Sequence, residues 1–202
     1  MCNLYTQTRS LDEVARLFRD LQMPLGFPEG APNLAPRDIA ITDSGPIVRA
    51  SAAGPDARAP SRYELVVRRW SWPGPGGKPV YNFRSDGREF PSGRCLILAD
   101  GFYEFTAPAD PKQKRKDRWL FTAADGSMLG IAGLIRSQSQ PVGEAFTMLT
   151  TEPGPDVARY HNRQVCVLPQ ESWRAWLDQD APARELLRPL PPGSLEVAPA
   201  PR

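Results

Sequence analysis

Short apolar runs, separated by turn-forming residues, recur along most of this chain. The range 63–70 is typical of a strand, with Leu65 and Val67 two positions apart and therefore on one face. Similar runs predict strands over residues 4–6, 38–41, 46–50, 94–99, 102–106, 118–123, 128–135, 146–151 and 164–168. Many short strands with few helices favour an α+β fold built on antiparallel sheet.

One stretch near the start has helical periodicity instead. Ser10 and Glu13 have the spacing of a capping box, and Pro24 and Gly26 end the predicted helix. The apolar residues that recur on its one face are Leu11, Val14, Leu17, Phe18 and Leu21. Two further helices are expected over residues 169–178 and 182–188.

Turn residues dominate three other stretches. The sequence Asp43-Ser44-Gly45 separates the strands predicted over 38–41 and 46–50, which indicates a hairpin between them. Residues 70–77 place two tryptophans before a run of proline and glycine, so no regular structure is expected there. Residues 191–202 form a proline-rich tail, expected to be ordered only where it docks.

The composition is that of an ordinary soluble globular protein, with 41% hydrophobic and 24% charged residues among 202. Residues 1–190 are therefore expected to form one domain with its own core. The formal net charge of +2 excludes a chain that is basic throughout, so any contact with nucleic acid must be local. A basic run over 112–118 is typical of a solvated hairpin tip, with weak phosphate contact as the alternative.

Cysteine use and hydropathy indicate the compartment. Cys2, Cys95 and Cys166 are too scattered for a disulfide framework, and an odd number of cysteines fits a reducing environment. Residues 1–20 contain no apolar signal segment, and no apolar run approaches ~18 residues. We therefore predict a cytoplasmic protein that does not contact membranes.

The second residue carries the most distinctive chemistry. If Met1 is removed, Cys2 presents a free α-amine and a thiol two carbons apart. Such an aminothiol condenses with an aldehyde, first through the amine as a Schiff base and then through sulfur, which closes a five-membered ring. An α-amine titrates near 7.7–8.0, against about 10.4 for lysine, so far more of it is neutral at pH 7.5. The alternative is a small second residue with no function.

Two further residues could move protons. His161, the single histidine, precedes Asn162 and Arg163 in a predicted loop, where it serves either as a proton shuttle or as a structural residue. Glu104 follows Phe102 and Tyr103 in a predicted strand. Burial among these aromatics would raise its pKa toward the range of acid–base catalysis, whereas an outward-facing glutamate is the alternative.

Taken together, these residues resemble a known family. The matching segments, in the family's order, are Met1-Cys2, Tyr81-Asn82-Phe83-Arg84, Arg94-Cys95-Leu96, the run from Ala99 to Glu104, Phe146 to Thr151, and His161-Asn162-Arg163. They look like the SRAP (SOS response-associated peptidase) family of abasic-site shields. The resemblance implies one domain with a twisted antiparallel, barrel-like sheet and a few flanking helices. It also implies no cofactor and no metal.

The resemblance further implies a reaction and its residues. After loss of Met1, Cys2 would form a thiazolidine crosslink with the ring-opened aldehyde of an abasic site in single-stranded DNA, in the DNA damage response. Abasic-site lyase and autoproteolytic activities would accompany it. The expected roles are orientation by Asn82, proton transfer by Glu104, a sugar hydrogen bond from His161, phosphate contacts from Arg84 and Arg163, and a DNA groove lined by Trp70 and Pro36. The protein would act as a monomer, associated with the nucleoid when bound.

This chain departs from the family pattern at several positions. Asn3-Leu4 replaces the usual Gly-Arg, Phe105 stands where tryptophan is common, and residues 70–77 are richer in proline and glycine. The usual strand near the C-terminus is not evident in the tail. These differences are expected to alter DNA affinity more than the chemistry.

Two other functions use some of the same residues. An N-terminal-nucleophile amidase or self-processing cysteine peptidase would use Cys2 with its own amine as the base, acting on an amide rather than an aldehyde. A zinc-stabilised binding module would use the three cysteines and His161, but the chain has no Cys-x-x-Cys pair to support it.

Overall fold

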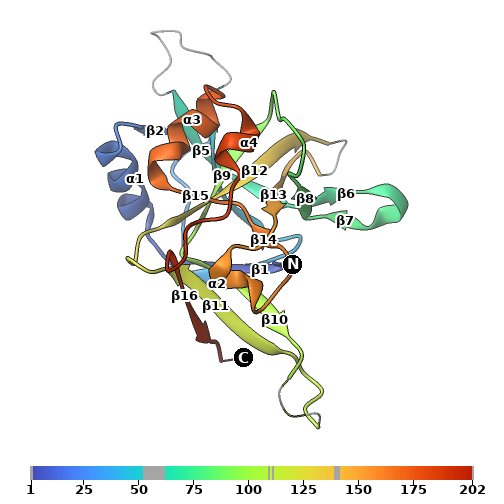
Figure 1. Ribbon diagram of the computed structural model, residues 1–202. Helices are drawn as coiled ribbons and strands as arrows, with labels where there is room; N and C mark the ends of the chain where they lie inside the picture. The colour runs from blue at the N-terminus through green and yellow to red at the C-terminus, as the bar shows by residue number, and fades with distance from the viewer. Residues whose placement is uncertain (1, 52–61, 109, 111, 139–141, 202) are drawn as a thin grey trace.

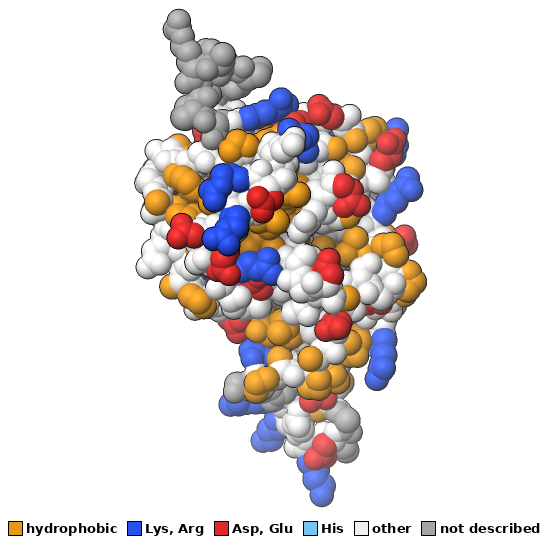
Figure 2. Space-filling model, turned by 90° about the vertical axis from the view of Figure 1, so that its left-hand side faces the viewer, with side chains coloured by type: hydrophobic (Ala, Val, Ile, Leu, Met, Phe, Trp, Pro, Cys, Tyr) orange, Lys and Arg blue, Asp and Glu red, His pale blue; other side chains and the backbone are white. Residues whose placement is uncertain are grey.

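The computed structural model describes residues 2–51, 62–108, 110, 112–138 and 142–201 (Figure 1). A five-stranded sheet, antiparallel throughout, has the order β16 (Leu195–Pro199), β11 (Asp117–Ala123), β10 (Gly101–Thr106), β1 (Leu4–Gln7) and β3 (Arg37–Ala40). Its β10–β11 hairpin projects from the body as a narrow arm (Figure 1 and Figure 2).

The larger sheet is closed on itself. Its order is β14 (Gln164–Val165), β13 (Glu144–Thr151), β12 (Leu129–Ser137), β9 (Arg94–Ala99), β4 (Ser44–Ala50), β5 (Tyr63–Trp70) and β2 (Leu25–Gly26). Strands β8 (Asn82–Arg84) and β15 (Val167–Leu168) pair with β13 and β12, respectively. Strand β13 also pairs in parallel with β5, at Ala145↔Arg69 and Phe146↔Trp70. This pairing closes the ring and confirms the predicted α+β fold with a barrel-like core.

Helix α1 (Leu11–Asp20) has the predicted capping box, because the Ser10 hydroxyl accepts from the Glu13 N–H and the Glu13 carboxylate accepts from the Ser10 N–H. The helix buries Phe18 against Trp173 of α3 (Trp173–Asp178), with ring centroids 5.4 Å apart. The second predicted C-terminal helix is the short α4 (Ala183–Leu186). In the described part of the chain, no helix is long and apolar enough to cross a bilayer.

The hairpin predicted around Asp43-Ser44-Gly45 is wrong. Strand β3 pairs with β1 in the smaller sheet, whereas β4 pairs with β5 and β9 in the larger one. The turn is real, because the Asp43 carboxylate accepts from the Ala40 N–H at 2.9 Å, but it leads the chain from one sheet to the other. A turn signal gives the change of direction and leaves open which strand becomes the partner.

Two stretches expected to lack regular structure contain strands. Within residues 70–80, β6 (Trp72–Pro73) pairs with β7 (Pro79–Val80) around the short helix η1 (Pro75–Gly77). In the tail, β16 extends the smaller sheet by pairing with β11, and Leu195 is buried there. The outer edge of β11 offers backbone donors and acceptors that a short extended segment can satisfy. The expectation of a tail without a strand is therefore corrected.

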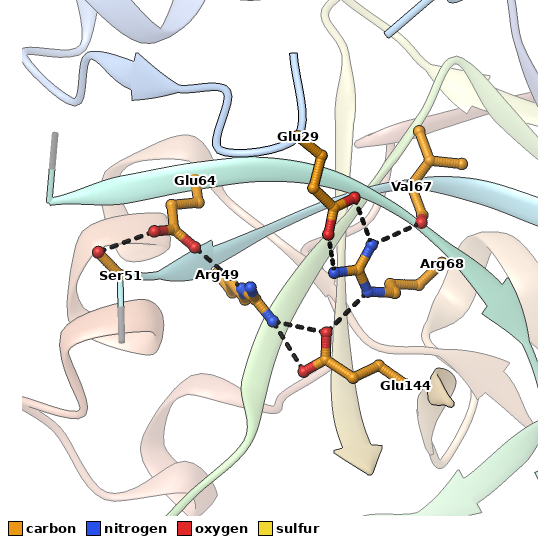
Figure 3. A network of polar contacts seen from close by, with 7 residues as sticks. All are labelled: Glu29, Arg49, Ser51, Glu64, Val67, Arg68 and Glu144. Atoms are coloured by element: carbon orange, nitrogen blue, oxygen red, sulfur yellow. Dashed lines mark hydrogen bonds and ion pairs between the residues drawn. The ribbon is translucent and has the colours of Figure 1, made fainter. Parts of the chain in front are cut away.

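A chain of charged side chains joins β4, β5 and β13 (Figure 3). Arg49 donates from one nitrogen to both oxygens of Glu144, at 2.8 and 2.9 Å, and Arg68 donates to the same carboxylate at 2.8 Å. Arg49 also pairs with Glu64, and Arg68 pairs with Glu29. Glu144 is the central carboxylate, because it alone contacts both of these arginines among the described residues.

We expect Glu144→Gln to lower the free energy of unfolding by about 1–2 kcal/mol at pH 7, since it leaves two partly buried arginines with weaker acceptors. Burial opposes the shift, but the hydrogen bonds and charges of Arg68 and Arg49 lower the pKa of Glu144. A lowered folded-state pKa stabilises above the unfolded value and is lost as pH falls through the folded value. Urea unfolding at pH 7 and pH 3 should therefore show a difference that shrinks in acid.

The exposed Glu152 provides the matched control, because Glu152→Gln removes the same charge outside this network. An equal loss of stability in both variants at pH 7 would contradict the role assigned to Glu144.

Candidate active site

The sheet register brings Cys2 to Glu104. Strand β1 lies between β3 and β10, with Tyr5 opposite Phe102, so the residues before β1 run alongside those after Phe102. Alternation along β1 buries Tyr5 and Gln7, which anchors the strand. Cys2 is only 1% exposed, and its thiol donates to the carbonyl of Leu4 at 3.2 Å.

Asn82 also contacts the backbone of Cys2. Its strand, β8, pairs in parallel with β13, with Asn82 opposite Met148. The Asn82 amide nitrogen donates to the Cys2 carbonyl at 2.7 Å. Among the described residues, the buried Asn82 Oδ1 has no hydrogen-bond partner. The amide therefore fixes the backbone of Cys2 and keeps one acceptor for another group.

Glu104 is buried, with 1% of its surface exposed, on β10. Burial raises the pKa of Glu104 to about 7, and the positively charged N-terminus and, after it, a hydrogen bond from the Cys2 backbone N–H partly oppose the shift. The nitrogen that becomes the α-amine after loss of Met1 therefore lies against this carboxylate. Near neutral pH both forms of Glu104 are well populated, so it can donate or accept a proton there.

The thiol of Cys2 is held in its neutral form. Burial, followed by the negative charge of Glu104, raises the pKa of the Cys2 thiol to about 12. Attack by sulfur consequently requires a nearby base to take its proton, and Glu104 is in electrostatic contact with it.

His161 lies in the loop after α2 (Pro155–Ala158), where its backbone N–H donates to the Val157 carbonyl. His161 Nδ1 lies 3.0 Å from both the backbone nitrogen and the carbonyl oxygen of Arg163, so the Arg163 backbone fixes the orientation of the ring. Burial lowers the pKa of His161, and the positive charges of the N-terminus and, to a smaller extent, of Lys116 act in the same direction. The ring therefore remains neutral near pH 7.

The contacts of this loop place His161 between the strands that carry Glu104 and Asn82. On one side, the ring of Tyr160 packs on Trp119, with centroids 5.0 Å apart, and Trp119 is the register partner of Glu104. On the other side, Arg163 donates to the carbonyl of Thr150 at 2.8 Å. Thr150 lies on β13, which pairs with β8. The loop thus contacts both sheets.

The residues expected to contact phosphate differ in accessibility. Arg84 is exposed on β8, two positions from Asn82 and therefore on the same face of the strand. Pro36 is exposed immediately before β3. Arg163, in contrast, is 13% exposed and forms two hydrogen bonds with the Asp86 carboxylate, at 2.7 and 3.1 Å. In the structure this carboxylate occupies the guanidinium edge that a phosphate would use.

Trp70 does not line a groove, and that expectation is corrected. The residue is fully buried at the point where β5 meets β13, and its indole N–H donates to the Tyr81 carbonyl at 2.9 Å. Its ring packs edge-on against Tyr5 and Tyr81, with centroids 5.3 and 6.2 Å away. A large apolar side chain at the seam of the barrel gains more from this packing than from exposure. Trp70 affects the position of Cys2 only indirectly, because it packs on Tyr5 of β1, the strand that follows Cys2.

Sequence reasoning missed Asp86. This carboxylate fixes Arg163, whose backbone contacts Nδ1 of His161. The arginine charge and its hydrogen bonds lower the pKa of Asp86, with Arg163 as the main cause. Asp86 and Arg163 are 77 positions apart, so no local pattern indicates the pair. In the described ranges, no group of three or more His, Cys, Asp and Glu could hold a metal ion, which gives the zinc-module hypothesis no support.

Comparison with known proteins identifies the family of this chain. The family model for SOS response associated peptidase (SRAP) matches residues 1–202. The chain is 24% identical over 210 residues to the abasic site processing protein YMR114C of Saccharomyces cerevisiae, covering 89% of this chain and 56% of that protein. It is 25% identical over 190 residues to the abasic site processing protein YoqW of Bacillus subtilis, covering 88% of this chain and 80% of that one.

The fold is also found among solved structures. A protein from Bordetella bronchiseptica superimposes with a TM-score of 0.72 over 100% of both chains, at 24% identity. A second, phage-related protein from the same organism reaches 0.72 at 21% identity, covering 100% of this chain and 95% of that one. With the family match over the whole length, these findings lead to one assignment: the chain belongs to the SOS response associated peptidase (SRAP) family.

Proposed function

We propose that this protein captures abasic sites in single-stranded DNA by forming a thiazolidine between Cys2, once Met1 is removed, and the ring-opened sugar aldehyde. The observation that carries the proposal is the contact between the Cys2 backbone nitrogen and Glu104, whose pKa is about 7. The relatives in yeast and Bacillus subtilis, both named abasic site processing proteins, support the same target and a role in the DNA damage response.

The reaction follows from the groups at the site. The neutral α-amine attacks the aldehyde carbon, and protonated Glu104 supplies the proton with which the hydroxyl of the adduct leaves as water. The resulting Schiff base accepts the sulfur of Cys2, whose proton passes to the carboxylate. One C–N and one C–S bond replace the C=O bond, and one water is lost. Hydrogen bonds from Asn82 and His161 orient the backbone of Cys2 and the sugar oxygen, respectively.

An abasic nucleotide suits a site that is buried in the protein. Cys2 and Glu104 are each only 1% exposed, so the reacting carbon must enter the protein. A nucleotide without a base has nothing to unstack, which lowers the cost of moving the sugar out of the strand. Arg84, exposed beside Asn82, is placed to bind an adjacent phosphate.

The proposal is tested with one incubation. Protein shown by intact mass to begin at Cys2 is mixed with single-stranded DNA that carries one abasic site, beside undamaged DNA of the same sequence. We expect a heat-stable band, confined to the abasic DNA, whose mass equals protein plus DNA minus one water.

A band on both DNAs, or none on either, contradicts the proposal. Cleavage of an added peptide by protein that forms no crosslink would favour the amidase or peptidase alternative, which uses the same Cys2 on an amide.

A further inference from the structure

The arm formed by β10 and β11 carries an unassigned charged surface. Its outer part, here called the basic arm, comprises Lys112, Lys114, Arg115 and Lys116, all of them exposed. Among the described residues, none of these four forms an ion pair. Two aspartates of the same hairpin form hydrogen bonds with other groups: Asp110 accepts from the Lys112 backbone N–H, and Asp117 accepts from the Gln113 side chain. Figure 2 shows Lys and Arg side chains at this narrow end of the molecule.

The base of the arm is held in place. Arg118 lies over the ring of Tyr103, 4.7 Å from its centroid, and the Trp119 indole donates to Thr106 at 2.9 Å across the two strands. Near the tip, the Gln113 amide donates to the Arg115 carbonyl at 2.7 Å and to Asp117 at 2.9 Å. These contacts hold the backbone on either side of the cations, which lowers the entropy cost of binding a charged ligand.

The arm starts at the candidate active site. Glu104 pairs with Trp119, and two residues further out Thr106 pairs with Asp117, next to Lys116. The charge of Lys116 is close enough to act on His161. The four cations lie within five consecutive residues, beyond the strand pairing that ends at Asp117. They therefore form one compact positive surface next to the candidate active site, of the kind that binds phosphates.

We propose that the basic arm binds the phosphate backbone of the DNA strand that continues from the abasic nucleotide; this inference rests on the proposed function. Residues 112–116 contain no aromatic side chain on which a base could stack. The arm therefore contacts the backbone without reading sequence, and it holds the strand while the lesion reacts. The DNA beside the lesion offers the same phosphates to the arm whether it is single-stranded or duplex.

The test measures non-covalent binding at several salt concentrations. The probe is single-stranded DNA with one tetrahydrofuran abasic analogue, which has no aldehyde and cannot crosslink. Lys112→Gln, Lys114→Gln, Arg115→Gln and Lys116→Gln are combined in the full chain. We expect the Kd for a 15-nucleotide probe to rise about tenfold at 50 mM salt. The slope of log K against log salt should shrink by about 3, at about 0.7 for each of four lost phosphate contacts. A trinucleotide probe should bind within about twofold of wild type.

The control removes the same charge elsewhere. Arg16→Gln, Arg19→Gln, Arg184→Gln and Arg188→Gln change exposed side chains on or next to α1 and α4, at the opposite end of the molecule (Figure 1). This variant should keep the wild-type slope. If the basic-arm variant has the slope and Kd of this control, the inference is overturned. Two further probes carry a duplex on one side of the lesion or on the other. The probe for which the basic-arm variant loses more affinity shows which flank the arm contacts.

Failure of the inference can be told apart from failure of the proposed function. DNA with a true abasic site is assayed in parallel with the same proteins. A wild-type protein that forms no crosslink overturns the proposed function, while the salt slopes still decide whether the basic arm binds DNA. A crosslink from both proteins with unchanged slopes overturns the arm alone.

Discussion

Replacing Cys2 with alanine is expected to reduce heat-stable crosslinking to abasic DNA at least 100-fold, to the level seen with undamaged DNA. The α-amine remains after loss of Met1 and can still form a Schiff base, but without sulfur the ring cannot close and the imine hydrolyses. Intramolecular closure supplies most of the stability of the product through its high effective molarity. Crosslinking is measured on denaturing gels, with and without borohydride, which should trap the imine in Cys2→Ala.

Cys166→Ala is the matched control, because Cys166 is also a fully buried, free thiol. It should crosslink like wild type, once thermal unfolding shows that both variants fold. If Cys2→Ala gives as much heat-stable product as wild type, Cys2 is not the nucleophile. Finding that both cysteine variants lose activity together would instead point to a structural effect.

The hypothesis that Cys2 is a nucleophile can be made from sequence, because it depends only on the position of this residue along the chain. An α-amine next to a thiol exists only at residue 2 after loss of Met1. The role of Glu104 could not be decided in the same way, since a strand places successive side chains on opposite faces. In the structure, Glu104 is buried where β10 pairs with β1 and where the loop of His161 packs on Trp119, and both β1 and this loop come from distant parts of the sequence.

Local pattern predicted the strands better than their partners. The capping box at Ser10 and the strand at 63–70 depend on neighbouring residues and are confirmed. The pairing of β16 with β11, and the separation of β3 from β4 into two sheets, depend on which edges remain unpaired elsewhere. The same limit explains Trp70, which lies at a seam that forms only when β13 meets β5.

Glu104→Gln is expected to lower the rate of crosslinking by about 10²–10⁴-fold, the usual contribution of general acid–base catalysis. Glutamine has nearly the same shape but can neither release nor accept the proton. In wild type, protonated Glu104 is needed to expel water, and burial raises its pKa to about 7, so this form declines above pH 7. The neutral amine increases through about pH 8. The rate should therefore pass through a maximum between these values.

The pH profile separates this role from a structural one. In Glu104→Gln the alkaline decline should disappear, and the remaining rate should rise with the neutral amine and then level off. Glu104→Asp keeps an acid and should recover part of the rate with a maximum still present. Single-turnover rates between pH 5.5 and 9 measure all three proteins. A purely structural defect lowers the rate at every pH and leaves the shape of the pH profile unchanged. If Glu104→Gln has a lower rate but the wild-type profile shape, Glu104 positions Cys2 without transferring a proton.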